Sequence, residues 1–206
     1  MLYYQTIDSK TLELLRKLME IPEFSMLNLV GGTSLALQIG HRKSLDIDLF
    51  GKFKLDDYQF STTLRQFGSV TQLNNSQNIK TYLINNIKVD FVNYPYSWIA
   101  PIHFKDDIRL ACTTDIAAMK FAAITGRGTK KDFIDIFSLL PYYSLEQMLE
   151  FYHKKFPDGS EFMVLKSLTY FEDAESEEPP VLIKKIDWEE VKSTIITETK
   201  KYISSR

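Results

Sequence analysis

Hydrophobic residues recur along this chain with two different spacings, which predict an alternation of helices and strands. Between Asp8 and Glu20, apolar residues return every three or four positions, as is typical of a helix that covers a core. The runs Ile79–Ile84 and Ile87–Val92 alternate with period two and are joined by Asn85-Asn86, which favours a tight hairpin turn. Further helices are expected over residues 56–67, 113–125, 145–156, 161–170 and 188–203, and a further strand over residues 68–73.

The densest pattern lies between Leu29 and Phe50. An apolar run ends there at Gly31-Gly32, and glycines allow the backbone to approach a ligand closely. Thr33-Ser34 then opens a short apolar helix that reaches Ile39. Because the first N–H groups of a helix have no partner within it, this turn is a candidate binding site for an anion such as a phosphate.

A second alternating run follows this helix. It places Leu45, Ile47 and Leu49 on the core face of a strand, and Asp46 and Asp48 together on the opposite face. Two carboxylates on one strand face, close to a phosphate-binding turn, are suited to hold a divalent metal ion for nucleotide chemistry. Each feature alone is common, since Gly-Gly is usually a turn and Asp-x-Asp is usually a solvated strand face, but their order is specific.

Asp90 is the third acidic candidate. Every second residue of its strand is apolar, so Asp90 lies on the opposite face together with Lys88. If this strand neighbours the strand of Asp48, the two carboxylates point to the same side. The alternative is an exposed aspartate in a hairpin.

Lys120 is the only charged residue between Ile116 and Ile124, in an otherwise apolar helix. A helix of this composition is expected to be buried. Its lysine must then either extend along its alkyl chain to water or meet an anion in a cleft. Thr114 or Asp115 is the expected N-cap.

The next helix carries two further acidic candidates. Gly126-Arg127-Gly128 ends the preceding helix, and Thr129 is expected to cap the new one. Asp132 and Asp135 lie off its core stripe, which consists of Phe133, Ile136, Phe137 and Leu140. Asp132 stands three residues after Thr129, close to a capping-box arrangement, so helix capping and a functional role are both open.

Three segments together resemble the AbiEii/AbiGii toxin family of nucleotidyltransferases. They read Gly-Gly-Thr-Ser-Leu-Ala-Leu from Gly31, Gly-His-Arg-Lys-Ser-Leu-Asp-Ile-Asp-Leu-Phe from Gly40, and Lys-Lys-Asp-Phe-Ile-Asp-Ile from Lys130. The arrangement of the first two also resembles the wider superfamily that includes DNA polymerase β. The resemblance spans about residues 27–140. It implies an α+β fold, with a small mixed β-sheet nucleotidyltransferase core flanked by helices and a helical C-terminal portion.

The same resemblance implies roles for the candidate residues. Asp46, Asp48 and Asp90 would bind Mg²⁺ or Mn²⁺ and act in catalysis together with Lys120 and Asp132. The nucleotide-binding residues would be Gly31, Gly32, Thr33, Arg42, Lys120 and Arg127. Asp135 would orient its neighbours or hold the helix packing.

The implied reaction is the transfer of a nucleoside monophosphate from a nucleoside triphosphate (NTP) to an acceptor. The resemblance implies RNA as acceptor, plausibly the 3′ end of a tRNA. It further implies a toxin of a toxin-antitoxin or phage-defence system, with a cognate antitoxin as partner. Two alternatives stay open, namely an enzyme that adenylylates proteins and a nucleotide-binding regulatory module without turnover.

The length and composition of the chain limit its domain number and its location in the cell. The 206 residues, 44% of them hydrophobic, suffice for one substantial core, and we expect a nucleotidyltransferase core at residues 1–110 with a helical region at residues 111–206 packed on it. The single cysteine excludes an internal disulfide, and neither a signal peptide nor a membrane-spanning apolar run is present. A cytoplasmic protein without membrane contact is therefore expected.

Charge is the last feature of the sequence. The net charge of −2 gives no overall attraction to nucleic acid. If the motifs assemble as the resemblance implies, a local basic patch would attract RNA, formed by Arg42, Lys43, Lys120, Arg127, Lys130 and Lys131. The acidic segment at residues 171–180 has the composition of a solvated linker, whereas the resemblance implies a strap packed on the core.

Overall fold

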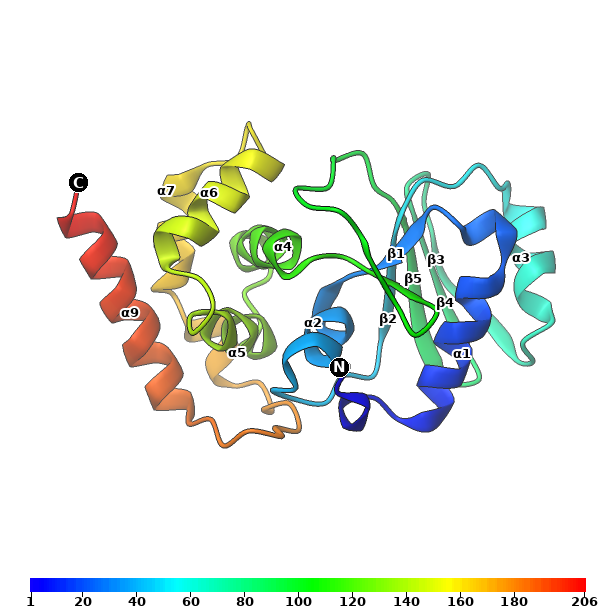
Figure 1. The fold of residues 1–206 in the computed structure, drawn as a ribbon, viewed down its shortest axis with the longest axis horizontal. Helices are drawn as coiled ribbons and strands as arrows, with labels where there is room; N and C mark the ends of the chain where they lie inside the picture. The colour runs from blue at the N-terminus through cyan, green and yellow to red at the C-terminus, as the bar shows by residue number, and fades with distance from the viewer.

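The structure is a computed structural model that describes residues 1–206, and it consists of a sheet half and a helical half (Figure 1). Seven strands form one mixed sheet in the order β3-β4-β5-β2-β1-β7-β6. The strands are β1 (Leu27–Leu29), β2 (Ile47–Gly51), β3 (Val70–Asn75), β4 (Ile79–Ile84), β5 (Ile87–Asn93), β6 (His103–Lys105) and β7 (Ile108–Leu110). β2 runs parallel to β5, and β1 runs parallel to β7, whereas the other neighbours are antiparallel.

The helices occupy both faces of the sheet and extend beyond it. They are α1 (Ser9–Glu20), α2 (Gly31–Ile39), α3 (Asp57–Arg65), α4 (Thr113–Gly126), α5 (Lys130–Leu139), α6 (Leu145–Lys155), α7 (Glu161–Leu168), α8 (Glu172–Glu175) and α9 (Trp188–Ser204). In Figure 1, α1 and α3 flank the sheet on one side, and α2 and α4 lie between the sheet and the remaining helices. The α+β class with a mixed sheet and a helical C-terminal portion is confirmed. None of the helices combines the length and the apolar character needed to cross a bilayer.

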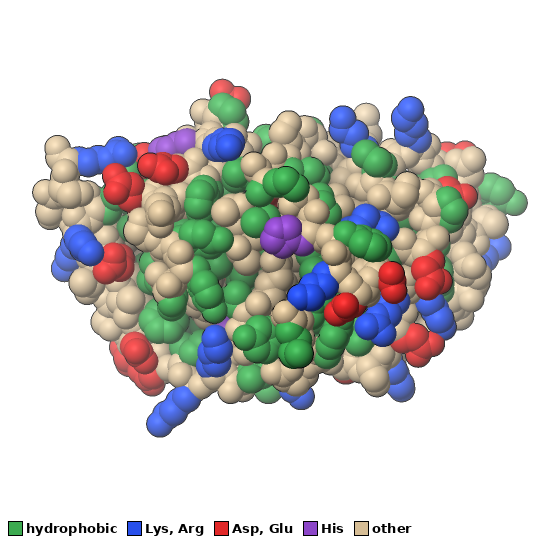
Figure 2. All heavy atoms as spheres, viewed as in Figure 1, with side chains coloured by type: hydrophobic (Ala, Val, Ile, Leu, Met, Phe, Trp, Pro, Cys, Tyr) green, Lys and Arg blue, Asp and Glu red, His purple; other side chains and the backbone are tan.

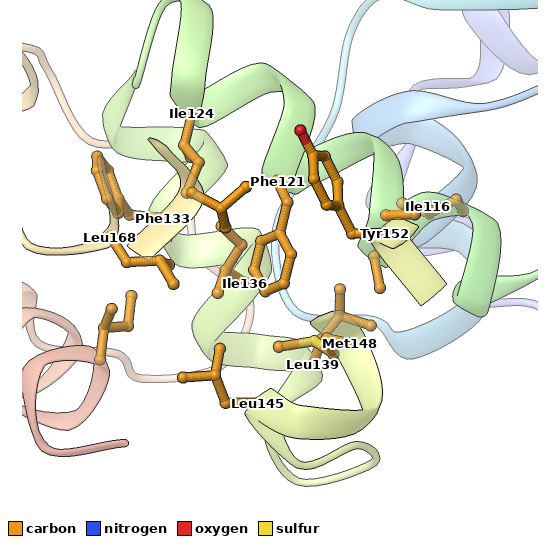
Figure 3. Close-up of a cluster of buried hydrophobic side chains, with 14 of the residues drawn as sticks. Ile116, Phe121, Ile124, Phe133, Ile136, Leu139, Leu145, Met148, Tyr152 and Leu168 are labelled. Carbon is orange, nitrogen blue, oxygen red and sulfur yellow. The ribbon is translucent and has the colours of Figure 1, made fainter. Parts of the chain in front are cut away.

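Two buried clusters correspond to the two halves. One lies between the sheet and helices α1 and α3, and Phe91 of β5 packs there against Phe60 of α3, with ring centroids 4.9 Å apart. The other joins α4, α5, α6 and α7 and includes Phe121 and Phe133, which are among the buried side chains drawn in Figure 3. α2 contributes to both clusters, because Leu37 belongs to the first and Leu35 to the second. The division of the chain near residue 110 stays a prediction.

Most predicted elements are present, and the local reasons are visible. The carboxylate of Asp8 accepts hydrogen bonds from the N–H groups of Lys10 and Thr11, which caps α1 as expected. Asn85 and Asn86 both have positive φ, at 49° and 67°, as a two-residue hairpin requires. In β5, Val89 and Phe91 are fully buried on the face opposite Asp90.

Three expectations about local structure are wrong. α2 begins at Gly31 and not at Thr33. Leu45 is 65% exposed, because β2 begins only at Ile47 and the preceding residues form a loop. Cys112, and neither Thr114 nor Asp115, is the N-cap of α4, and Asp115 is buried inside the first turn.

The hairpin β6–β7 was not predicted from the sequence. Its strands have three residues each, which is too short for an alternating pattern to be recognised. Its turn is Asp106-Asp107, with φ values of 51° and 64°. Aspartate tolerates this left-handed conformation better than most residues do, so the Asp-Asp pair was the available signal.

The acidic segment at residues 171–180 is packed on the body of the protein, as a strap. Ala174 within it is fully buried. The carboxylate of Glu177 accepts a hydrogen bond from the backbone N–H of Lys130, at 2.7 Å. Further along, Lys43 N donates to Val181 O at 2.7 Å, and Arg42 forms a β-bridge with Leu182. The strap thus joins α5 to the segment before β2, and a solvated linker is excluded.

Candidate active site

Asp48 and Asp90 are brought together by the pairing of two parallel strands. Asp48 of β2 stands opposite Asp90 of β5 in the ladder. Neighbouring strands are about 4.8 Å apart, so the two carboxylates are close enough to share a ligand. The expectation that Asp90 lies beside Asp48 is therefore confirmed.

Gly31 places the N-terminus of α2 against this carboxylate pair. Its φ is +65°, and a Cβ at this position would overlap the carboxylate of Asp48. Only glycine therefore allows the first turn of the helix to approach so closely. The first N–H groups of α2 have no acceptor within the helix and are available to an anion beside Asp48.

The negative charges of Asp48 and Asp90 repel each other, and their surroundings compensate them only in part. Burial, followed by the negative charges of Asp90 and Asp46, raises the pKa of Asp48 to about 6. The Asp90 Oδ1 atom is buried without a hydrogen-bond partner, and its other oxygen accepts a bond from Lys88 Nζ at 2.5 Å. An added cation would relieve both the repulsion and the unpaired oxygen.

These residues line a cavity of about 820 Å³ between the sheet and helices α4 and α6. Five predicted site residues line it, namely Gly31, Asp48, Asp90, Lys120 and Arg127. Five others do not line it, namely Gly32, Thr33, Arg42, Asp46 and Asp132. The structure thus separates the predicted residues into those that face a ligand space and those that lie behind it.

Lys120 neither extends to water nor presents a free ammonium group. Its Nζ lies 2.8 Å from Asp132 Oδ1 and 2.5 Å from Asp135 Oδ2, and its side chain is 6% exposed. Burial opposes the charge on Lys120, but Asp135 and Asp132 outweigh it and raise the pKa of the lysine. The anions that Lys120 meets are therefore two aspartates of α5, while the lysine still borders the cavity.

Arg42 was predicted to bind nucleotide, and in the structure its side chain does not line the cavity. The guanidinium forms a bidentate pair with Asp135, at 2.6 Å from Nε and 2.9 Å from Nη2. The side chain is 4% exposed. It also covers Gly32, where a Cβ would overlap the guanidinium. Arg42 and Gly32 therefore form part of the support behind the cavity.

Thr33 has a structural use for its hydroxyl. Its Oγ1 contacts Ser44 Oγ at 2.8 Å and donates to the carbonyl oxygen of Asp46, and the residue is 1% exposed. Thr33 does not line the cavity, so its side chain is not placed to meet a phosphate there. The hydroxyl instead fixes the loop that leads into β2.

His41 completes the surroundings of Asp135. Its Nε2 lies 2.7 Å from Asp135 Oδ1, while its Nδ1 has no partner. Burial outweighs the aspartate and lowers the pKa of His41, so the imidazole is neutral at pH 7 and Nε2 is the donor. Burial also opposes the charge on Asp135, yet Lys120 and Arg42 hold its pKa well below its usual range.

Asp132 does not have the helix-capping role that the sequence left open, and its carboxylate makes other contacts. It accepts hydrogen bonds from Arg127 Nε at 2.9 Å and from the Thr129 hydroxyl at 2.6 Å. The Thr129 side chain caps no N–H group, so a capping box is absent. Asp132 is fully buried behind the cavity and orients Arg127 and Lys120. Asp132 does not line the cavity, and in this place it would act as a positioning residue.

The predicted basic patch does not assemble. Lys130 is 7% exposed and donates from Nζ to the carbonyl oxygens of Glu175 and Glu177 in the strap. Arg42 and Lys120 are buried in ion pairs. On the face drawn in Figure 2, basic and acidic side chains are interspersed. Of the proposed patch, Arg127 is the cation that lines the cavity with a largely exposed side chain.

Sequence reasoning missed an aromatic part of the cavity. Tyr94, Tyr96, Tyr152 and Phe156 line it together with Lys88. A signal was present, because residues 88, 90, 92, 94 and 96 continue one period-two face past the end of β5 and all five line the cavity. The alternation was recognised only up to Val92.

The donor set fits a divalent cation held by two protein carboxylates. No three His, Cys, Asp or Glu side chains are gathered closely enough to hold a metal ion together. Asp46, predicted as the third ligand, adds negative charge near Asp48 but does not line the cavity. Asp48 and Asp90 remain, and Mg²⁺ is commonly bound by one or two carboxylates with water and substrate phosphate as the other ligands.

Comparison with known proteins identifies the family of this chain. Residues 13–202 match the family described as "Nucleotidyl transferase AbiEii toxin, Type IV TA system". The chain is 31% identical over 201 residues to "Uncharacterized protein aq_aa25" of Aquifex aeolicus, with 94% of this chain and 96% of that protein covered.

Solved structures share the fold at lower identity. The nucleotidyltransferase toxin MenT4 of Mycobacterium tuberculosis has a TM-score of 0.56 and 16% identity, with 91% of this chain and 80% of that chain covered. JHP933 of Helicobacter pylori has a TM-score of 0.54 and 15% identity, with 97% and 94% covered.

Proposed function

Because this chain belongs to the AbiEii family of nucleotidyltransferase toxins, we propose that it transfers a nucleoside monophosphate from an NTP to RNA. The 3′ end of a tRNA is the proposed acceptor. The toxicity would be neutralised by a cognate antitoxin. The observation that carries the chemistry is that Asp48 and Asp90 face one cavity together with the N-terminus of α2 and Arg127.

Charge neutralisation is the main requirement of this reaction, because the reacting phosphates are strongly anionic. Asp48 and Asp90 would hold Mg²⁺ or Mn²⁺, and the bound ion would polarise the α-phosphate and activate the attacking hydroxyl. The unpaired Asp90 Oδ1 and the raised pKa of Asp48 support this assignment. Asp46 would strengthen the negative field around the ion without contacting it.

The remaining residues of the site would hold the triphosphate. The N–H groups of the first turn of α2 bind phosphate oxygens through the partial positive charge of the helix end. Arg127, whose side chain is 60% exposed, contacts the leaving pyrophosphate. Asp132 fixes the direction of that guanidinium through a bond at 2.9 Å. Lys120 contributes its charge at the border of the cavity, where Asp132 and Asp135 hold its ammonium group.

The direct test offers each radiolabelled NTP with Mg²⁺ to the purified protein, together with total RNA in one set of reactions and RNA-free cell lysate in the other. We expect label in RNA, and no label when Mg²⁺ is chelated or when Asp90 is replaced by asparagine. A labelled protein band without labelled RNA would replace the RNA acceptor with a protein acceptor. Label in neither polymer would overturn the enzymatic assignment.

A further inference from the structure

One end of the cavity is built from aromatic rings, which we call the aromatic wall and define as Tyr94, Tyr96, Tyr152 and Phe156. The rings form a continuous chain of contacts. The centroids of Tyr94 and Tyr96 are 5.2 Å apart, those of Tyr96 and Phe156 are 4.8 Å apart, and those of Tyr152 and Phe156 are 5.4 Å apart. All four residues line the same cavity as the two carboxylates.

The aromatic wall and the carboxylates follow one strand direction. Asp90, Val92 and Tyr94 are successive residues on one face of β5 and its continuation, and Tyr94 N bonds to Gly51 O at 2.8 Å, which keeps that continuation beside β2. At about 3.3 Å per residue, Tyr94 lies roughly 13 Å along the strand from Asp90. With a divalent cation on the carboxylates, a ligand that reaches both ends of the cavity would be anionic at one end and flat and apolar at the other.

Two features of the aromatic wall leave contacts open for a ligand, one at Tyr94 and one at Tyr96. The Tyr94 side chain is 9% exposed, and its hydroxyl is buried without a hydrogen-bond partner although the residue faces the cavity. A buried hydroxyl in this state costs free energy until a ligand or water satisfies it. Tyr96 is 45% exposed, which leaves part of its ring open to stacking.

A buried ion pair makes the aromatic wall rigid. Asp115 accepts hydrogen bonds from Ile99 N at 2.9 Å and from Lys155 Nζ at 2.7 Å. The same ammonium group lies 4.6 Å from the ring centroid of Trp98 and 5.1 Å from that of Tyr94. The segment that carries Tyr94 and Tyr96 is thus fixed to α4 and α6, so little conformational freedom is lost when a ligand binds.

We propose that the aromatic wall is the binding site for the base of the donor nucleotide. The exposed face of Tyr96 stacks on the base, and the hydroxyl of Tyr94 hydrogen-bonds to a polar edge of the base. The ribose and the α-phosphate then lie along Val92 toward Asp48 and Asp90. This inference rests on the proposed function, because it takes the ligand at the carboxylates to be a nucleotide.

Isothermal titration calorimetry with the full chain tests the proposal. The probes are the four NTPs and inorganic tripolyphosphate, each with Mg²⁺. We expect Tyr96→Ala to weaken NTP binding at least about tenfold, as loss of one stacking partner does, and to leave tripolyphosphate binding unchanged. Tyr96→Phe should retain NTP affinity because it retains the ring.

The second variant tests the hydrogen bond. Tyr94→Phe should reduce the differences in affinity among the four NTPs, because it removes a group that reads the edge of the base. Tyr142→Ala is the matched control, since Tyr142 is 54% exposed and lies outside the cavity. Thermal melting of each variant, together with tripolyphosphate binding, reports whether the site remains folded.

Three results would overturn the proposal, and they differ in what else they remove. If the wild-type protein binds tripolyphosphate and NTPs equally well, the base site is wrong and the carboxylate site stands. If Tyr96→Ala binds NTPs normally but transfers poorly to RNA, the aromatic wall holds the acceptor. If the wild-type protein binds neither probe, the proposed function fails together with this inference.

Discussion

Two pairs of aspartates lie beside Lys120, and their surroundings differ. The first pair is Asp48 and Asp90 on the sheet. The second pair is Asp132 and Asp135 on α5. The second pair is neutralised by Lys120, Arg42 and Arg127, and the pKa of each of its members is held below the usual range even though burial opposes this. The first pair has Lys88 as its only ion-pair partner. There, burial and mutual repulsion raise the pKa of Asp48 to about 6.

The difference distinguishes a pair that supports the fold from a pair that is suited to bind a cation. A buried carboxylate with all its partners in place stabilises the arrangement around it and has little capacity left for a ligand. A buried carboxylate that lacks partners is retained at a cost to stability, and such groups concentrate at functional sites. A count of acidic residues would make the two pairs equally good candidates for a ligand site. Their hydrogen bonds and neighbouring charges distinguish them.

The largest expected effect is on activity. Asp48→Asn should lower nucleotide transfer by at least about a thousandfold, which corresponds to roughly 4 kcal/mol of transition-state stabilisation. It should leave the melting temperature unchanged or higher, because it removes a repelled negative charge while conserving shape. Transfer assays and thermal melting of the same preparation check both parts. Asp107→Asn is the matched control, since Asp107 is exposed and its φ of 64° is one that asparagine adopts easily. Near-normal transfer by Asp48→Asn would remove Asp48 from the catalytic set.

Replacing an aspartate of the second pair by asparagine should lower the stability of the protein instead. Asp135→Asn leaves Arg42 and Lys120 buried with one fewer negative charge, and we expect the free energy of unfolding to fall by about 3 kcal/mol or more. Urea unfolding of this variant beside Asp48→Asn measures the contrast directly. Equal stabilities of the two variants would show that the two pairs are not distinct in the way described here.

The third prediction concerns the stability of the protein at low pH. Because the folded-state pKa values of Asp132 and Asp135 are lowered, the stability that they contribute is present above about pH 4 and is lost as the pH falls further. Arg127→Gln removes one partner of Asp132, which raises the pKa of that carboxyl toward its usual value. The pH at which the protein unfolds in acid should therefore move upward. Circular dichroism recorded from about pH 2 to about pH 7 measures the midpoint of acid unfolding for both proteins.

Lys131→Gln is the control for that experiment. Lys131 lies in the same first turn of α5 and makes no ion pair in the structure. Its substitution removes the same charge and should leave the acid midpoint unchanged. An equal shift in both variants would mean that net charge, and not the contact with Asp132, sets the acid limit.

The smallest expected effect concerns a neutral partner. Thr129→Val removes the hydroxyl that donates to Asp132 at 2.6 Å, while Lys120 and Arg127 remain. A loss of about 1 to 2 kcal/mol in unfolding free energy is expected, as for one hydrogen bond to a charged acceptor. Thr129→Ser should restore most of it, and urea unfolding of the two variants gives the difference. If Thr129→Ser is as unstable as Thr129→Val, the methyl group of the threonine and not its hydroxyl is what matters.

The sequence by itself determined most of the elements and the strand faces on which Asp48 and Asp90 lie. Period-two spacing placed Asp48 and Asp90 opposite apolar residues that must be buried, so their faces were set by local geometry and the hydrophobic effect. Gly31 was recognisable as a point of close approach, because glycine has no Cβ and lets the backbone lie near a ligand. The resemblance added the family and the role of each motif.

Tertiary structure alone decided which charges meet. Arg42 and Asp135 are separated by 93 positions in sequence, and Lys130 bonds to carbonyl groups 45 and 47 positions away. A charged side chain has no periodicity that reveals its partner, and its energy depends on distance and burial, which only the folded chain fixes. For that reason the sequence offered Arg42 and Lys130 as ligand-binding cations, whereas the fold uses Arg42 to neutralise α5 and Lys130 to hold the strap.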